Sequence, residues 1–150
     1  MLKFPYKIDD YSNIPSAIIT VVAGWDELWC PLDIKLDTGA DMCILPLAFL
    51  QTVKAPYLGN IKVGDYRGGI QLMPMWNIKI KFNGFEMEAK ASCTASKLAL
   101  IGMNFISNFN VIFMKDCFLI TDKEVIIKEV EDVFDKTDTL LVGKQENDNT

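Results

Sequence analysis

Residues 36–41 read Leu36-Asp37-Thr38-Gly39-Ala40-Asp41 and form a polar loop between two apolar runs. The run before the loop, residues 32–36, alternates apolar and polar side chains, as a strand with one buried face does. The run after it, residues 42–45, is apolar again and leads to Pro46, a residue suited to the first position of a short helix. We therefore expect core structure to hold the loop at both ends and to keep the Asp37 carboxylate in surroundings of low dielectric.

Composition excludes several other kinds of catalytic site. The chain contains no histidine, so a Ser-His or Cys-His catalytic pair and a Cys/His metal site are impossible within one subunit. The cysteines stand singly, without C-x-x-C spacing, and we interpret them as small buried hydrophobes: Cys30, Cys43, Cys93 and Cys117. Carboxylates remain as the acid–base groups, and we expect no metal or other cofactor.

The size of the chain indicates one domain, and its charge argues against a nucleic acid or an anionic membrane as a partner. The 150 residues, half of them hydrophobic, are enough to bury a core. A net charge of −5 without a basic cluster argues against nucleic-acid and anionic-membrane partners. No apolar run approaches the ~20 residues of a membrane span. The start of the chain also lacks the order of a signal peptide, so the expected location is cytoplasmic.

The pattern of the remaining residues predicts an all-β chain. Three hairpins are expected, formed by residues 16–23 with 28–36, residues 77–82 with 85–89 across Asn83-Gly84, and residues 111–113 with 118–120. Short helices are expected at residues 46–53 and 103–108. Many short strands with little helix favour a small domain closed as a barrel or as a sandwich.

Residues 60–72 contain the next informative pattern. Alternating side chains stand on both sides of Gly68-Gly69, which indicates a hairpin with a mobile tip. An ordinary surface hairpin is the alternative, because Gly-Gly turns are common.

Two of these segments together resemble a known family. The Asp37 loop resembles the active-site loop of the retropepsin-like aspartic proteases, which include the retroviral proteases and their cellular and bacterial relatives. Leu100-Ile101-Gly102, followed by Met103-Asn104-Phe105-Ile106, is similar to the family's second signature, which runs beside the catalytic loop and opens a short helix. The resemblance covers about residues 16–121 and implies a single-lobe, barrel-like acid protease fold, half of a pepsin-like enzyme.

The resemblance implies a homodimeric aspartic endopeptidase. The chain has one Asp-Thr-Gly and is too short for a second lobe of this kind, so Asp37 of each subunit would meet its copy across a two-fold axis. Two carboxyl groups at such a short distance share one proton and can serve as base and acid in peptide hydrolysis. The substrate would be a peptide or an unstructured protein, bound as an added strand and preferring hydrophobic flanking residues.

The resemblance also assigns roles around the catalytic residue. Thr38, Gly39 and Ala40 match the active-site loop, Asp41 matches a substrate-contacting acidic position, Gly68 and Gly69 become the tip of a flap, Ile70 lines the substrate, and Leu100, Ile101 and Gly102 form the structural signature. Met42 and Met103 depart from the retroviral members, which often have an acidic residue and an arginine there. Asp41 would then lack the family's ion pair with that arginine. Asp41 as a helix or turn cap and Thr38 as a plain loop residue remain alternatives.

Two other functions stay open for the whole chain. The first is a catalytically silent retropepsin-like module for dimerisation or peptide binding, and the second is a β-barrel ligand binder with a chance Asp-Thr-Gly. The expected organisation is an irregular N-terminal arm at residues 1–15, the protease-like domain at 16–121, a C-terminal extension at 122–142 that reads as either strand or helix, and a disordered tail at 143–150. The arm's Phe4, Tyr6 and Tyr11 are expected to pack on their own domain, with a partner subunit as the alternative.

Overall fold

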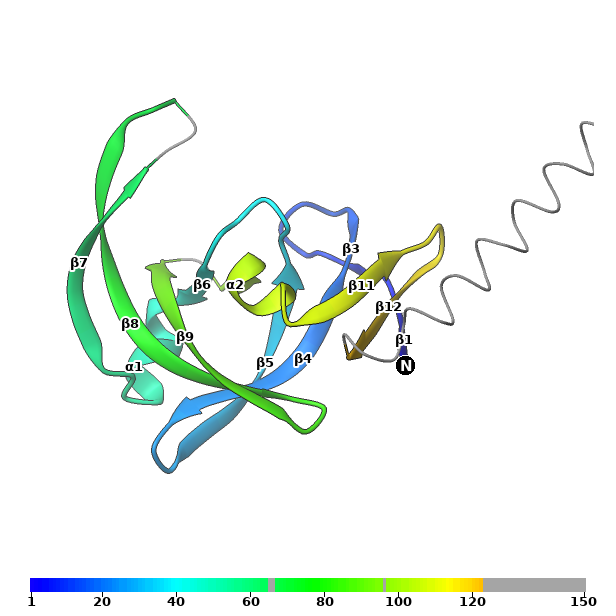
Figure 1. Cartoon of the computed structure of the whole chain (residues 1–150), viewed down its shortest axis with the longest axis horizontal. Helices are drawn as coiled ribbons and strands as arrows, with labels where there is room; N and C mark the ends of the chain where they lie inside the picture. Colours follow the sequence, from blue (N-terminus) through cyan, green and yellow to red (C-terminus); the bar gives the residue numbers. More distant parts are fainter. Residues whose placement is uncertain (65–66, 96, 123–150) are drawn as a thin grey trace, which may run out of the picture.

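The computed structural model describes residues 1–64, 67–95 and 97–122 (Figure 1). Strands predominate in these ranges, and the helices are two short ones, α1 (Leu47–Thr52) and α2 (Met103–Ile106). The all-β prediction is therefore confirmed. Neither of these described helices has the length and apolar character needed to cross a bilayer. The cytoplasmic location stays a prediction.

Most of the strands belong to one sheet that closes on itself. The strands are β1 (Leu2–Pro5), β2 (Lys7–Ile8), β3 (Pro15–Ser16), β4 (Ile18–Trp25), β5 (Leu28–Leu36), β6 (Cys43–Pro46), β7 (Tyr57–Gly64), β8 (Ile70–Phe82), β9 (Phe85–Thr94), β10 (Leu100–Ile101), β11 (Phe109–Phe113) and β12 (Cys117–Asp122). The order β4-β5-β10-β6-β9-β8 returns to β4 through a β4–β8 pairing, which closes a barrel, while β7 extends β8 outside it. Of the two closures that the sequence allowed, the chain adopts the barrel.

The barrel closes where Gly24 lies opposite Lys79. On its other side, a Cβ atom added to Gly24 would overlap the Leu28 carbonyl oxygen, so only glycine lets the backbones of β4 and β5 approach this closely in their hairpin. The interior is filled by the inward-facing residues of the alternating strands. Among those that are at most 1% exposed are Ile19, Val21, Ile34, Leu45, Ile78, Ile80 and Ile101. The apolar residues that alternate with polar ones in the sequence thus form the buried face of each strand.

The three hairpins that the sequence predicted are confirmed. Trp25 lies opposite Leu28, Phe82 opposite Phe85, and Phe113 opposite Phe118. Asn83 and Gly84 both have positive φ angles, 48° and 80°, as a two-residue type I′ turn requires. The prediction for Pro46 is wrong by one residue, because parallel pairing with β9 keeps Pro46 extended (ψ 134°) immediately before α1.

The prediction of an irregular N-terminal arm is wrong for much of residues 1–15. Strand β1 pairs antiparallel with β12, which also pairs with β11, and together they form a separate three-stranded sheet (Figure 1). The Phe4 ring stacks on Phe118 at 5.3 Å between centroids, and the Tyr6 hydroxyl donates to the Met114 carbonyl oxygen at 2.8 Å. Both arm residues therefore pack on their own domain, while Tyr11 stays exposed. The extension at 123–142 and the tail at 143–150 lie outside the described residues.

A buried carboxylate fixes the remainder of the arm to β5. Asp9 is 5% exposed and accepts hydrogen bonds from the Tyr11 backbone N–H (2.9 Å), the Ser12 hydroxyl (3.1 Å) and the Lys35 ammonium group (3.0 Å). The Tyr11 N–H and then Lys35 hold the pKa of Asp9 below its ordinary value of 3.8. Because Lys35 belongs to the strand that leads to Asp37, the turn at residues 9–14 is tied to the strand that carries the loop.

The lowered pKa of Asp9 predicts a pH-dependent stability difference from an Asp9→Asn variant. The ionised carboxylate stabilises the folded state, so the wild type should exceed the variant above about pH 5, and the difference should shrink as the pH falls through 3.8 and then through the lower pKa of the folded protein. Urea unfolding followed by tryptophan fluorescence between about pH 3 and pH 7 measures this difference.

Asp10→Asn is the matched control. Its side chain is exposed, and no described residue pairs with it, so its stability should follow that of the wild type at every pH. An Asp9→Asn difference that does not change with pH would contradict an ionic role for Asp9.

Candidate functional site

Asp37 stands at the point where β5 leaves the barrel. Its backbone N–H donates to the Ile101 carbonyl oxygen of β10 at 2.9 Å, so the sheet pairing continues into the loop. Its side chain is half-buried, and the Oδ1 atom accepts the Gly39 backbone N–H at 3.0 Å. A second bond runs from the Ala40 N–H to the Asp37 carbonyl oxygen at 3.2 Å. The loop thus orients the carboxylate that it carries.

Gly39 is the residue that lets the loop fold back onto its own carboxylate. A Cβ atom at this position would lie 3.3 Å from Asp37 Oδ1, a tight contact with the atom that accepts the Gly39 N–H. Because Gly39 has no side chain, its N–H can point at the Asp37 carboxylate. This hydrogen bond compensates the half-buried carboxylate for the water contacts that it has lost.

The second signature segment lies beside the loop. Strand β10 sits between the two strands that flank the loop, with Ile101 opposite Leu36 of β5 and Leu100 opposite both Lys35 of β5 and Ile44 of β6. At the start of α2, the Met103 N–H donates to the Ala40 carbonyl oxygen at 2.7 Å and the Asn104 N–H donates to the Asp41 carbonyl oxygen at 3.0 Å. These contacts satisfy carbonyl groups of the loop with the free N–H groups of a helix start.

Gly102 allows this contact. A Cβ atom there would lie 2.5 Å from the Met42 carbonyl oxygen and 2.6 Å from the Ala40 carbonyl oxygen. Both are backbone atoms, so neither can rotate away as a side chain would. A side chain at position 102 would therefore push the loop away from α2.

A small hydrogen-bonded group lies beneath the loop. The buried Cys43 thiol donates to Asn104 Oδ1 at 3.4 Å, and Asn104 Nδ2 donates to the Lys90 carbonyl oxygen at 3.3 Å. Burial raises the pKa of Cys43, which therefore stays a neutral thiol. The prediction that the cysteines are buried is correct for Cys43. It is wrong for Cys30, Cys93 and Cys117, which are only half-buried.

The polar side chains of the loop face outward. Thr38 and Asp41 are exposed, and neither side chain forms a hydrogen bond or ion pair within the part of the chain that the structure describes. Neither α1 nor α2 has a side-chain cap, so Asp41 does not cap a described helix and contacts α2 only through its carbonyl oxygen.

The residues at the tip of the β7–β8 hairpin are not brought to Asp37. The hairpin extends from the barrel, and its tip stands apart from the loop between β5 and β6 (Figure 1). Gly68 has a φ of 79° with open space around it, Gly69 follows it, and Ile70 is 73% exposed. The predicted hairpin is present, and Figure 1 shows that it extends away from the candidate site.

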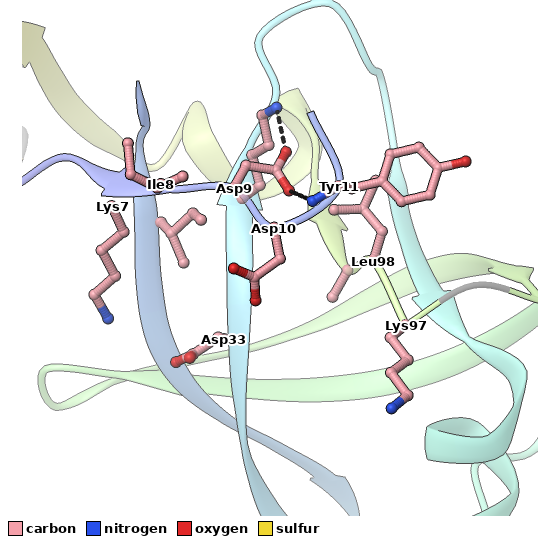
Figure 2. Close-up of a pocket in the computed structure, with 11 residues that line it drawn as sticks. Lys7, Ile8, Asp9, Asp10, Tyr11, Asp33, Lys97 and Leu98 are labelled. Atoms are coloured by element: carbon pink, nitrogen blue, oxygen red, sulfur yellow. Dashed lines mark hydrogen bonds and ion pairs between the residues drawn. The ribbon is translucent and has the colours of Figure 1, made fainter. Parts of the chain in front are cut away.

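A pocket of about 610 Å³ beside β5 contains residues that the sequence did not single out (Figure 2). It is lined by Lys7, Ile8, Asp9, Asp10, Tyr11, Ile18, Asp33, Lys35, Lys97, Leu98 and Ala99. The Asp9–Lys35 ion pair connects the N-terminal segment to β5 at this pocket. These two residues are 26 positions apart, so no local pattern could have revealed it.

Comparison with known proteins supports the fold assignment. No family model and no curated protein sequence matches the chain. Its fold is similar to that of a retropepsin-like aspartic protease from Rickettsia conorii, with a TM-score of 0.53 and 15% identity over 79% of this chain and 88% of that one. The EIAV protease complexed with the inhibitor HBY-793 aligns with a TM-score of 0.49 and 20% identity, over 61% of this chain and 86% of that one. The Rickettsia likeness shows a retropepsin-like fold, as the sequence predicted.

The geometry at Gly102 predicts that Gly102→Ala destabilises the protein. The added methyl group would overlap two backbone carbonyl groups, and overpacking of this kind costs about 1–3 kcal/mol. Gly64→Ala is the control, because its Cβ atom would meet nothing within 4 Å. Urea unfolding of both variants tests the difference, and equal stability would show that the loop does not depend on this contact.

Proposed function

We propose that this chain is an aspartic endopeptidase that works as a homodimer, with Asp37 of each subunit as the acid–base pair. The observation that carries the proposal is the Asp37 carboxylate, half-buried at the end of β5 and held by the Gly39 N–H. At 15% identity the Rickettsia likeness concerns the fold alone, so it supplies the framework for such a site and not the activity.

The chemistry requires a second carboxyl group. Hydrolysis without a metal or a covalent nucleophile needs one group to take a proton from water and another to give a proton to the substrate. One ionised Asp37 would take the proton as the water oxygen attacks the carbonyl carbon. The partner subunit's Asp37 would protonate the carbonyl oxygen. When the C–N bond breaks, the amine nitrogen takes a proton from one Asp37, and a hydroxyl group of the tetrahedral intermediate returns its proton to the other, so one shared proton remains.

The exposed surface supports a second copy as the source of that group. Within the described residues, β11 pairs with no strand except β12, so it is an edge strand of its three-stranded sheet. Phe113 and Met114, at the end of this strand, are 50% and 52% exposed. An edge strand with exposed apolar side chains beside it suits packing against another chain. The exposed Thr38 hydroxyl would be available to the opposite loop.

The β7–β8 hairpin supports a peptide substrate. Ile70 and Leu72 are 73% and 65% exposed on a hairpin whose tip contains Gly68 and Gly69. Closure of this flap over an extended peptide would cover these side chains and exclude water from the site. Asp41 and Ile70 would then contact the substrate, which would bind by main-chain hydrogen bonds.

Replacing the candidate catalytic residue tests the activity. Asp37→Asn keeps the size of the side chain but removes the base, so cleavage of an unstructured protein such as casein should fall by at least about 100-fold. Peptide binding should persist, because the flap and the barrel are unchanged. Cleavage is measured by the release of peptides, and binding by fluorescence polarisation.

Asp26→Asn is the control for this substitution. Asp26 lies in the turn between β4 and β5, and its carbonyl oxygen, not its carboxylate, accepts the Trp29 indole N–H. Wild-type protein that binds peptides and cleaves none would favour the silent peptide-binding module instead.

A mixing experiment tests the shared site separately. Equal amounts of wild type and Asp37→Asn, allowed to exchange subunits, should give about one quarter of the activity of the same total amount of wild type, because only wild-type homodimers have both carboxyl groups. Independent active monomers would give about one half, and active mixed dimers about three quarters. Either of these values would contradict the proposed pair.

A further inference from the structure

The pocket beside β5 adjoins the candidate catalytic loop. Lys35 lines it and lies two residues before Asp37, about 7 Å along an extended strand. Opposite Lys35, Leu98 and Ala99 lead into β10, and the Lys35 N–H donates to the Ala99 carbonyl oxygen at 2.9 Å. The volume of about 610 Å³ lies in the range of pockets that hold small ligands. One side of this pocket is therefore formed by the strand that carries Asp37.

Three lysines and three aspartates line the pocket, and two of the aspartates, Asp10 and Asp33, form no ion pair within the described residues. Asp9 and Lys35 neutralise each other in a 3.0 Å ion pair. Figure 2 shows Asp10 extending into the space above Asp33, with Lys7 and Lys97 on opposite sides of it. Asp33 accepts a hydrogen bond from the Thr20 hydroxyl at 2.5 Å and has no cationic partner among the described residues. Ile8, Ile18 and Leu98 add apolar lining.

We propose that this pocket binds a long basic side chain, arginine or lysine, of the peptide substrate, at a position flanking the cleaved bond. The apolar lining suits the aliphatic stem of such a side chain, and the carboxylates of Asp10 and Asp33 suit its cationic head. The substrate preference is thus for a basic residue at one flanking position. This inference rests on the proposed function in one respect, that the ligand is a peptide. It does not require that the peptide is hydrolysed.

Asp9 acts as a positioning residue for this pocket. Its buried carboxylate is held by Tyr11, Ser12 and Lys35, and Asp10 is the next residue in the chain. The Asp9 N–H also donates to the Ile14 carbonyl oxygen at 3.0 Å, which closes the turn. The backbone at Asp10 is therefore held in place before the substrate arrives, which lowers the entropic cost of binding.

Peptide binding to the full-length Asp37→Asn variant tests the proposal without cleavage. Fluorescent peptides carry arginine at one flanking position at a time, with norleucine in the reference peptide. At one position arginine should bind about tenfold more tightly, and about 0.5 M salt should remove most of the gain. The gain should disappear in an Asp10→Asn/Asp33→Asn variant, which is expected to fold normally because both side chains are exposed.

The controls separate this inference from the proposed function. Asp26→Asn, made in the Asp37→Asn background, should keep the arginine preference. Equal affinity for arginine and norleucine at every position, no peptide binding at all, a preference for glutamate, or a preference that survives the Asp10→Asn/Asp33→Asn change would each overturn the inference. Selective arginine binding by a wild type that cleaves nothing would support the pocket and refute the endopeptidase.

Discussion

The structure depends on one close backbone contact, where Gly102 meets the loop that follows β5. Carbonyl groups of Ala40 and Met42 occupy the space that a side chain at position 102 would need. Because that space is free, the Met103 N–H reaches the Ala40 carbonyl oxygen at 2.7 Å, and β10 lies between β5 and β6. The orientation of Asp37 follows from this contact, since its own N–H is held by Ile101 of the same segment.

The contact has different consequences for the fold and for the chemistry. For the fold, it inserts a two-residue strand that completes the barrel. For the chemistry, it holds one carboxylate rigidly, and a single carboxylate cannot be base and acid at once. The rigid loop and the edge strand β11, with Phe113 and Met114 exposed at its end, therefore belong together in the proposed mechanism. The loop supplies half of a site, and the edge offers a surface through which a second half can join.

The parts that the sequence predicted correctly are those encoded locally. The Asn83-Gly84 turn, the β-branched hairpin before Asp37 and the Leu-Ile-Gly segment each carry their own signal within a few residues. The parts that it missed depend on pairs far apart in the chain. Leu2 lies opposite Ile120, and Asp9 meets Lys35, so neither β1 nor the pocket has a local pattern. Alternation also buries one face of a strand without saying whether the sheet closes as a barrel, which depends on the pairing of β4 with the distant strand β8.

The pairing of β1 with β12 also affects the order of events at the ribosome. Leu2 is synthesised long before its partner Ile120, which is among the last of the described residues to be made. At roughly 5–20 residues per second, the nascent N-terminal strand waits several seconds or more for its partner. The barrel can form during this interval, whereas the three-stranded sheet is completed only when translation of the strand pair β11–β12 has ended.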